Sequence, residues 1–247
     1  MRSFRLLEKE ALAPGFFRLR FEGTLGASPG QFVMVRAWPG FDPLLARPFS
    51  VHDQDESSFC LLFQVRGRGT RILAGLREGD RAQILGPLGR GFELSFEGPA
   101  ILVAGGIGIA PFLFLTKELK ARGQEVFLFY GARRTAELLL LEEFEALGAK
   151  LFLATEDGSR GERGFVTGPL ATFLERNRGT IFACGPMPML KAVRELAKTH
   201  QLKAYLSLEA RMACGLGMCL GCVVPRAEGG FLHVCTEGPV VSGEEVL

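Results

Sequence analysis

The stretch Cys214-Gly-Leu-Gly-Met-Cys219-Leu-Gly-Cys222 places three cysteines within nine residues, and Cys235 follows it. The resulting C-x4-C-x2-C-x12-C spacing is typical of the thiolate ligands of a 2Fe–2S cluster. Glycines between the cysteines let the backbone wrap closely and turn N–H groups toward sulfur. A structural zinc site or a pair of disulfides is the alternative, but zinc sites favour C-x2-C pairs and the stretch contains one such pair. We therefore expect Cys214, Cys219, Cys222 and Cys235 to hold a 2Fe–2S cluster, in a segment formed by residues 204–247.

The composition is that of a well-packed globular protein. Hydrophobic residues make up 47% of the 247 residues, and the formal net charge of +2 gives no reason to expect a nucleic-acid partner. The first residues, Met-Arg-Ser-Phe-Arg, lack the apolar core of a signal peptide. The most apolar run, residues 100–115, is broken by glycines and a proline and is too short to span a bilayer. We expect a cytoplasmic protein without membrane insertion, whose clustered cysteines are reduced and bind metal.

Residues 1–97 contain short strand-like runs separated by Gly, Pro and Asp turns. The expected strands are 15–22, 31–37, 49–52, 58–65 and 81–85. Their close spacing indicates a small antiparallel barrel. A helix is expected over residues 71–76, with Thr70 as its N-cap.

From residue 98 the pattern changes to apolar strands that alternate with amphipathic helices. The expected strands are 100–104, 126–130, 150–155, 180–184 and 203–208, and the expected helices are 111–122, 136–147, 168–176 and 188–199. This alternation indicates a doubly wound parallel sheet over residues 98–203, covered by helices on both faces. The predicted fold class is therefore α+β and multidomain, with an antiparallel barrel, an α/β domain and a small C-terminal cluster segment.

Two short motifs in the predicted barrel are suited to binding a phosphate-containing cofactor. In Arg47-Pro48-Phe49-Ser50, the arginine can pair with a pyrophosphate oxygen, the proline stiffens the strand entry, and the serine hydroxyl can reach a flavin ring nitrogen. Gly69-Thr70 lies at a helix start, where free N–H groups and the helix dipole attract anions. Taken singly each motif is weak, because a tetrapeptide of this kind is also an ordinary strand start.

Two further motifs lie at strand-to-helix turns of the predicted α/β domain. Gly105-Gly106-Ile107-Gly108-Ile109-Ala110-Pro111 follows a strand and opens a helix, which is the phosphate-cradle position of a dinucleotide fold, although it is not a full G-x-G-x-x-G. Cys184-Gly185-Pro186 ends another strand, so the thiol is expected in the ligand crevice. A buried cysteine in a βα turn is the alternative interpretation.

Arg133-Arg134 follows the strand expected over residues 126–130. This pair can bind a 2′-phosphate and favour NADP, but two solvated arginines at a helix start would have the same sequence.

Together and in this order, the motifs resemble those of the ferredoxin reductase superfamily. In that superfamily R-x-[FY]-S and G-x-[GA]-[ST] hold FAD, G-x-G-x-[AT]-P binds the nicotinamide nucleotide, and the cysteine of C-G-P lies beside the reactive carbon of nicotinamide. The resemblance implies that Arg47, Pro48, Phe49, Ser50, Leu62, Phe63, Gln64, Gly69 and Thr70 bind FAD, and that Gly105, Gly106, Gly108, Pro111, Cys184, Gly185 and Pro186 bind NAD. It also implies reacting positions for Cys184, beside nicotinamide, and Ser50, near the flavin.

The order of barrel, nucleotide domain and cysteine segment resembles the electron-transfer subunits of class 1B NAD-dependent dihydroorotate dehydrogenases. That family commonly reads S-L-E-x-x-M-x-C-G-x-G-x-C-x-G-C, and this chain reads Ser207-Leu-Glu-Ala-Arg-Met-Ala-Cys214 and onward. One departure is Phe63-Gln64, where the family usually has Tyr-Arg. The resemblance implies an oxidoreductase subunit of pyrimidine biosynthesis that passes electrons from a partner flavin through the 2Fe–2S cluster and FAD to NAD⁺. The expected partner is an FMN-containing catalytic subunit, in a heterotetramer with two copies of each chain.

Two other functions remain open at this point. The flavin subunits of hydrogenases and of NADH:ferredoxin transhydrogenases share the same three units, and a non-enzymatic iron–sulfur sensing module would keep the cysteines alone. Under the subunit hypothesis, Met212, Leu216, Met218 and Leu220 form an exposed apolar contact patch around the cluster. The alternative is that these four side chains pack on the nucleotide domain.

Overall fold

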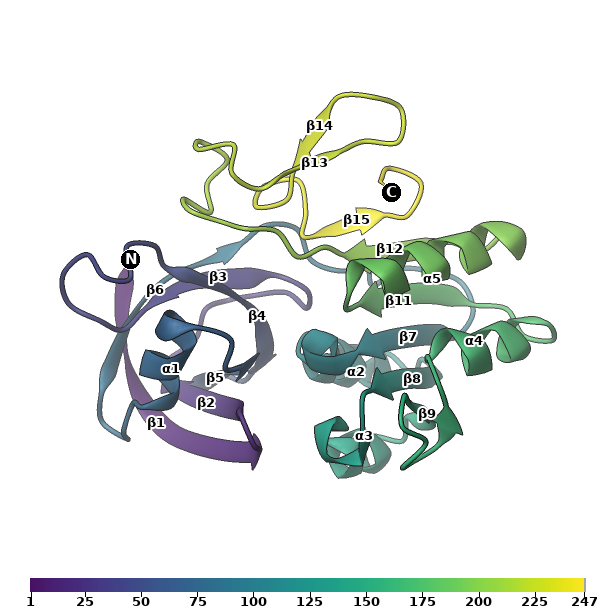
Figure 1. Cartoon of the computed structure of the whole chain (residues 1–247), viewed down its shortest axis with the longest axis horizontal. Coiled ribbons are helices and arrows are strands. Elements are labelled where there is room, and N and C mark those ends of the chain that lie inside the picture. The colour runs from purple at the N-terminus through teal and green to yellow at the C-terminus, as the bar shows by residue number, and fades with distance from the viewer. Residues whose placement is uncertain (247) are drawn as a thin grey trace.

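The computed structural model describes residues 1–246 and contains a barrel, an α/β domain and a C-terminal segment that lies across both (Figure 1). The barrel closes in the order β1-β2-β5-β4-β3-β6, with antiparallel neighbours throughout. Its elements are β1 (Arg2–Ala13), β2 (Phe16–Glu22), β3 (Phe32–Arg36), β4 (Arg47–Gln54), β5 (Ser58–Gln64), α1 (Arg68–Ala74) and β6 (Arg81–Leu88). The predicted antiparallel barrel is therefore confirmed.

Two details of the predicted barrel were wrong. Strand β1 was not predicted, because its many charged residues hide an alternation in which Phe4 and Leu6 point into the barrel core. Thr70 is not an N-cap, because the helix begins earlier and Gly67 occupies that position. The Thr70 hydroxyl instead lies in the first turn, where it donates to the Gly67 carbonyl at 2.9 Å and accepts the Arg66 and Gly67 N–H groups at 2.9 and 3.0 Å.

The α/β domain is built on a mostly parallel sheet with the order β10-β9-β8-β7-β11-β12-β15. Its strands are β7 (Ala100–Gly105), β8 (Val126–Ala132), β9 (Lys150–Thr155), β10 (Glu162–Arg163), β11 (Thr180–Cys184), β12 (Ala204–Ser207) and β15 (Val240–Ser242). The helices are η1 (Gly106–Ile109), α2 (Phe112–Ala121), η2 (Thr135–Glu137), α3 (Leu141–Ala146), α4 (Thr167–Leu174) and α5 (Met187–Thr199). Because β8 and β11 lie on opposite sides of β7, the sheet has its topological switch point between β7 and β11.

Alternate residues of the central strands pack into separate hydrophobic cores on the two faces of this sheet. On β7, Leu102 joins the core that contains α2 and α3, whereas Ile101 and Val103 join the core that contains α4 and α5. Both faces are therefore covered by helices, as the continuous apolar strands predicted. Figure 1 shows this layered domain beside the barrel.

The helix predicted over residues 136–147 is broken in the structure. The buried Tyr130 hydroxyl donates to the Glu137 carbonyl at 3.0 Å and accepts the Leu139 N–H at 3.3 Å, which fixes an irregular turn. Leu140 then adopts a left-handed conformation with φ of 61°, and α3 starts after it. The helical periodicity of the sequence does not reveal this turn, because its cause is a side chain on a neighbouring strand.

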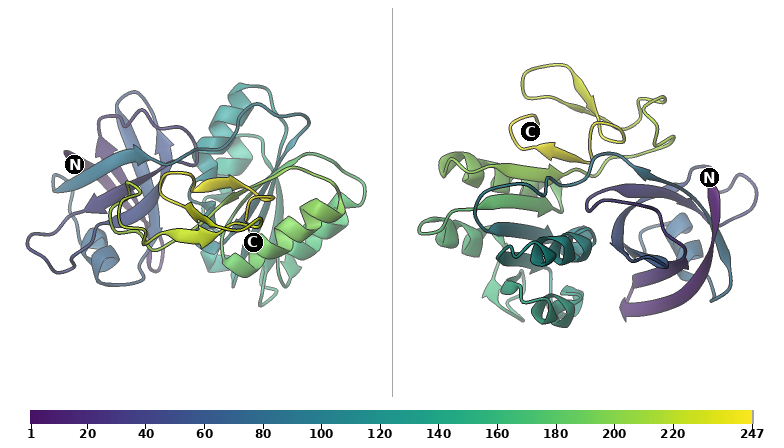
Figure 2. Two further views of the ribbon diagram at one scale, coloured as in Figure 1. Left: turned by 90° about the horizontal axis from the view of Figure 1, so that it is seen from above. Right: turned by 180° about the vertical axis from the view of Figure 1, so that it is seen from behind.

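The C-terminal segment is anchored in the same sheet. It carries the hairpin β13 (Val223–Pro225) and β14 (Phe231–His233), and β15 then pairs antiparallel with β12. Seen from above in Figure 2, the segment lies over the junction between the barrel and the α/β domain. This position places the segment next to both domains. Within residues 1–246, no helix is long and apolar enough to cross a membrane.

Polar side chains also join the barrel to the α/β domain. Arg18 of β2 donates to both carboxylate oxygens of Glu143 on α3, each at 2.8 Å, while Lys117 of α2 pairs with Asp53 of β4 at 2.5 Å. These contacts fix the orientation of the two domains, and the cavity described next lies between them.

Candidate functional site

A cavity of about 1100 Å³ lies where the barrel, the α/β domain and the start of the C-terminal segment meet. Its volume exceeds the range of roughly 300–1,000 Å³ that is usual for a pocket holding one small ligand. The cavity is lined by predicted site residues from both domains, namely Arg47, Pro48, Phe49, Ser50, Leu62, Phe63, Gln64, Thr70, Gly105, Gly106, Gly108, Pro111, Cys184, Gly185 and Pro186. The structure thus brings together residues that lie up to 139 positions apart in the sequence, from Arg47 to Pro186.

The barrel side of the cavity is formed by the neighbouring strands β4 and β5. Arg47 is half-buried; its Nη1 atom donates to the Leu45 carbonyl at 2.5 Å, and its guanidinium lies 5.8 Å from the centre of the Trp38 ring. Gly69 does not line the cavity but lies directly beneath Arg47, since a Cβ on Gly69 would be 2.9 Å from the Arg47 Nε atom. Gly69 therefore makes room for the arginine.

The α/β side of the cavity is formed where β7 and β11 end, at the switch point of the sheet. Gly108 lies so close to β11 that a Cβ on it would be 2.1 Å from the Cys184 carbonyl oxygen, so only glycine fits. Pro111 is the N-cap of α2, whereas the sequence predicted it as the first residue of the helix. The glycine loop is thus pressed against the end of the neighbouring strand, which is the arrangement that cradles phosphate groups in doubly wound sheets.

Cys184 ends β11 in register with Ser207 of β12, and its thiol shares a hydrogen bond with the Ser207 hydroxyl. Burial, with a smaller contribution from the charge of Glu209, raises the pKa of this thiol to about 12. Cys184 is therefore a neutral thiol at the wall of the cavity across the physiological pH range. A neutral thiol can orient a ligand there, but it does not act as a thiolate nucleophile.

Glu209, Arg66 and Met212 also line the cavity but were not predicted as cofactor-binding residues. Glu209 reaches the solvent through the cavity but is surrounded by protein, and this desolvation raises the pKa of its carboxyl while the Arg66 charge opposes the rise. Glu209 is the second residue after the carboxyl end of β12, a position that could have identified it. Met212 was expected on an exposed patch, but it is buried between the cavity and the C-terminal segment.

The four cysteines of the C-terminal segment form two pairs. The side chains of Cys214 and Cys219 lie within hydrogen-bonding reach of each other, as do those of Cys222 and Cys235. Backbone N–H groups also point at sulfur, from Leu216 to Cys214 at 3.3 Å and from Gly217 to Cys235 at 3.1 Å. The Leu216 N–H group is the main cause that lowers the pKa of Cys214 to about 6, whereas burial raises the pKa of Cys235 to about 11.

The four thiols supply the donor set that a 2Fe–2S cluster takes. Such a cluster needs four thiolates shared between two irons, and the two cysteine pairs offer that number. The N–H groups directed at sulfur are the contacts that stabilise such a cluster electrostatically.

The cysteine segment is packed directly against the barrel. A Cβ on Gly215 would lie 2.8 Å from Met34 Cγ and 3.0 Å from Leu88 Cδ1, so the loop rests on β3 and β6. Met34 is paired across the sheet with Pro48, which lines the cavity. Met34 therefore connects the cysteine loop to the strand that carries the predicted flavin site.

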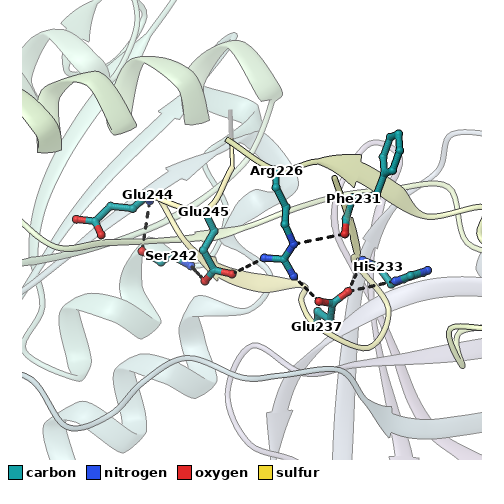
Figure 3. Close-up of polar contacts among 7 residues, drawn as sticks. All are labelled: Arg226, Phe231, His233, Glu237, Ser242, Glu244 and Glu245. Atoms are coloured by element: carbon teal, nitrogen blue, oxygen red, sulfur yellow. Dashed lines mark hydrogen bonds and ion pairs between the residues drawn. The ribbon is translucent and has the colours of Figure 1, made fainter. Parts of the chain in front are cut away.

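A network of charged residues braces the far side of the cysteine segment (Figure 3). Arg226 bridges Glu237 and Glu245, with the Glu245 contact at 3.0 Å. Glu237 also accepts the His233 backbone N–H at 2.8 Å, which fixes the turn that carries Cys235. Because Glu245 follows β15, the network connects the hairpin to the sheet edge and limits movement of the cysteines.

Residues 102–195 match the oxidoreductase NAD-binding domain, and residues 209–247 match the iron–sulfur cluster binding domain of dihydroorotate dehydrogenase B. A protein of Caldanaerobacter subterraneus subsp. tengcongensis, named dihydroorotate dehydrogenase B (NAD(+)), electron transfer subunit, is 40% identical, over 98% of this chain and 97% of its own length. This chain belongs to the family of dihydroorotate dehydrogenase B electron transfer subunits.

A further relative and two solved structures share the sequence or the fold of this chain. A dihydroorotate dehydrogenase B electron transfer subunit homolog of Aquifex aeolicus is 41% identical, over 89% of this chain and 86% of its own length. Among solved structures, an NADH-dependent reduced ferredoxin–NADP oxidoreductase superimposes with a TM-score of 0.89 at 30% identity, covering 100% of this chain and 90% of that chain. An Amycolatopsis cytochrome P450 reductase superimposes with a TM-score of 0.70 at 25% identity, covering 81% of this chain and 67% of that chain.

Proposed function

We propose that this chain is the electron-transfer subunit of an NAD-dependent dihydroorotate dehydrogenase, with FAD, a 2Fe–2S cluster and NAD as its cofactors. The observation that carries the proposal is the shared cavity, which joins the flavin-type residues of β4, the nucleotide loop after β7 and the start of the cysteine segment. A flavin accepts or donates electrons singly and in pairs, and so connects the two-electron chemistry of nicotinamide with the one-electron chemistry of an iron–sulfur cluster. In this role the protein binds and orients its cofactors and excludes water from them.

On the barrel side, the residues of β4 and β5 would hold the flavin. Arg47 supplies a guanidinium for a phosphate oxygen, and the Ser50 hydroxyl faces the cavity beside it. Leu62, Phe63 and Gln64 form the neighbouring wall, where the apolar side chains suit a flat ring. Gln64 carries no charge, so it would offer the flavin a neutral hydrogen bond.

On the α/β side, the residues at the ends of β7 and β11 would hold the nicotinamide nucleotide. The loop of Gly105, Gly106 and Gly108 leaves room for phosphates, while Cys184, Gly185 and Pro186 form the wall nearest the barrel side. The Cys184 thiol keeps its proton because its pKa is about 12, so it orients the nicotinamide without forming a bond to it. Pro111 fixes the start of α2 and thereby the end of the phosphate loop.

We further propose that the partner is an FMN-containing catalytic subunit and that two copies of each chain form a heterotetramer. The partner oxidises dihydroorotate, and its electrons reach this chain at Cys214, Cys219, Cys222 and Cys235. Leu216, Met218 and Leu220 support this arrangement, because their side chains are 51%, 80% and 58% exposed around the cysteines. The complex is proposed to be cytoplasmic, where the four thiols stay reduced for iron binding.

A second candidate function is that of a flavin and iron–sulfur subunit in an NADH:ferredoxin transhydrogenase or a hydrogenase. The 30% identical NADH-dependent reduced ferredoxin–NADP oxidoreductase, which superimposes over the full chain, supports this alternative. Both functions use the same cavity and cysteines, so the partner protein distinguishes them.

The test is to purify the chain anaerobically with its natural partner and to measure NAD⁺ reduction with dihydroorotate as electron donor. The proposal expects an FMN-containing partner and NADH formation. A partner that exchanges electrons with ferredoxin or hydrogen, with no reaction on dihydroorotate, would establish the second candidate. Visible absorption of flavin and cluster together separates both from an iron–sulfur sensor, which would show cluster bands alone.

A further inference from the structure

The part of the cavity at the ends of β8 and β9 is distinct from the nicotinamide end near Cys184. It is lined by Arg133, Glu137 and Glu156, and by residues 164–167. Gly131 at the end of β8 packs against Val166, with only 2.9 Å between an added Cβ and the Val166 Cβ, so this loop closes one side. In a doubly wound sheet, the strand after the phosphate loop is where the ribose of a dinucleotide lies.

Both arginines at this end are already paired with one carboxylate. Arg133 donates to Glu137 through Nε at 3.0 Å and Nη2 at 2.9 Å, and Arg134 Nε lies 3.3 Å from the same carboxylate. Glu137 is only 7% exposed, and its backbone carbonyl is held by the Tyr130 hydroxyl at 3.0 Å. The guanidinium N–H groups with which Arg133 could bind a phosphate are therefore already bonded to a buried carboxylate.

A second carboxylate, Glu156, lines the same part of the cavity. The Glu156 N–H donates to the Ala132 carbonyl at 3.1 Å, and the next N–H, of Asp157, donates to the Arg133 carbonyl at 3.2 Å. These bonds hold the ends of β8 and β9 side by side. With Arg133, Arg134, Glu137 and Glu156 together, the formal charges cancel at this end of the cavity.

We propose that Glu137 and Glu156 select a nucleotide with a free ribose 2′-hydroxyl, and thus NAD over NADP. A 2′-phosphate carries between one and two negative charges and needs unpaired arginines, which Glu137 withholds. A ribose hydroxyl, in contrast, can donate a hydrogen bond to a carboxylate such as Glu156. The inference rests on the proposed nucleotide site, and it explains why the Arg133-Arg134 pair does not make this an NADP enzyme.

The test compares binding of 5′-AMP and 2′,5′-ADP to the cofactor-loaded protein by calorimetry, which needs neither the partner nor turnover. Wild type is expected to prefer 5′-AMP. In Glu137→Gln, the affinity ratio should shift toward 2′,5′-ADP by about tenfold, because Arg133 is released. Adding Arg133→Ala to Glu137→Gln should abolish the gain, and Glu142→Gln, an exposed carboxylate of α3 outside the cavity, should leave the ratio unchanged.

An unchanged ratio in a folded Glu137→Gln protein would overturn the inference and leave the proposed function intact. If that variant does not fold, Glu156→Gln provides the test. It is expected to shift the affinity ratio toward 2′,5′-ADP as well, and an unchanged ratio in Glu156→Gln would also overturn the inference. Failure of wild type to bind either nucleotide would overturn the nucleotide site itself, and the inference with it.

Discussion

The Nδ1 atom of His52, on strand β4 of the barrel, lies 2.6 Å from the carbonyl oxygen of Ala110, in the nucleotide loop of the α/β domain. His52 is completely buried, and its Nε2 atom has no hydrogen-bond partner among residues 1–246. The bond joins a strand that carries Ser50 to a loop that carries Gly108, so it helps to set the distance between the two halves of the cavity. An ionised His52 would place a charge in this dry junction.

The first prediction follows from this burial, which lowers the pKa of His52 to about 4 from 6.5. The unfolded chain takes up a proton near pH 6.5 while the folded protein does not, so stability is complete above 6.5 and is lost as the pH falls toward 4. Between pH 7.5 and pH 5 this group alone should lower the free energy of unfolding by about 2 kcal/mol. Urea unfolding at both pH values measures the loss.

The matched variants for this experiment are His52→Gln and His200→Gln. His52→Gln should remove most of the loss between pH 7.5 and pH 5, because glutamine does not titrate. His200 lies at the end of α5, away from the domain junction, and its replacement should preserve the loss. The same pH dependence in His52→Gln as in wild type would show that another group is responsible.

The second prediction concerns Gly69, which lies beneath Arg47. Gly69→Ala should push the Arg47 guanidinium aside and weaken FAD binding about tenfold, while Arg47→Ala should weaken it roughly ten- to a hundredfold. Gly168→Ala in α4, where an added Cβ meets nothing within 4 Å, is the control. Fluorescence titration of the apoprotein with FAD measures the three affinities, and full affinity in both Gly69→Ala and Arg47→Ala would remove Arg47 from the flavin site.

The third prediction separates the cluster from the rest of the chain. Cys222→Ala should lose iron and the cluster absorbance, because it removes one of four thiolate ligands. NADH oxidation with a two-electron dye should survive, since the flavin and nucleotide residues are untouched. Cys60→Ala, which changes a buried barrel thiol, should keep its iron. Iron analysis after anaerobic reconstitution measures the iron content of both variants. A full iron content in Cys222→Ala would refute the ligand assignment.

The fourth prediction concerns the exposed apolar residues around the cysteines. Met218→Glu should weaken partner binding at least tenfold without loss of iron, because it places a charge on a side chain that is 80% exposed beside the cluster segment. Leu7→Glu on β1 of the barrel provides a matched change elsewhere. Titration calorimetry with the isolated partner measures both, and equal affinities for wild type and Met218→Glu would locate the interface on another face.

Much of this architecture could be predicted because its signals are local. Cysteine spacing, glycine-rich turns and apolar strands such as residues 180–184 depend on neighbours in the sequence. The break at Leu140 could not be predicted, because a hydroxyl from β8 causes it. Arg133 and Glu137 are only four residues apart, but their pairing depends on the turn that this hydroxyl fixes. The entry of Glu209 into the cavity likewise required the structure. Charged side chains become informative only when their partners across the fold are known.

The pairing of β12 with β15 has a consequence for how the iron-binding segment is retained. Ser207 is opposite Val240, and the Leu208 N–H donates to the Pro239 carbonyl at 2.8 Å, so residues 208–239 leave and re-enter the sheet at adjacent points. The strand hydrogen bonds at these two points offset part of the entropy of closing this long connection. We therefore expect both ends of the segment to stay in register when iron is lost. The segment is thus an insertion between two paired strands. Removing β15 together with it would expose the edge of β12 to pairing with other chains.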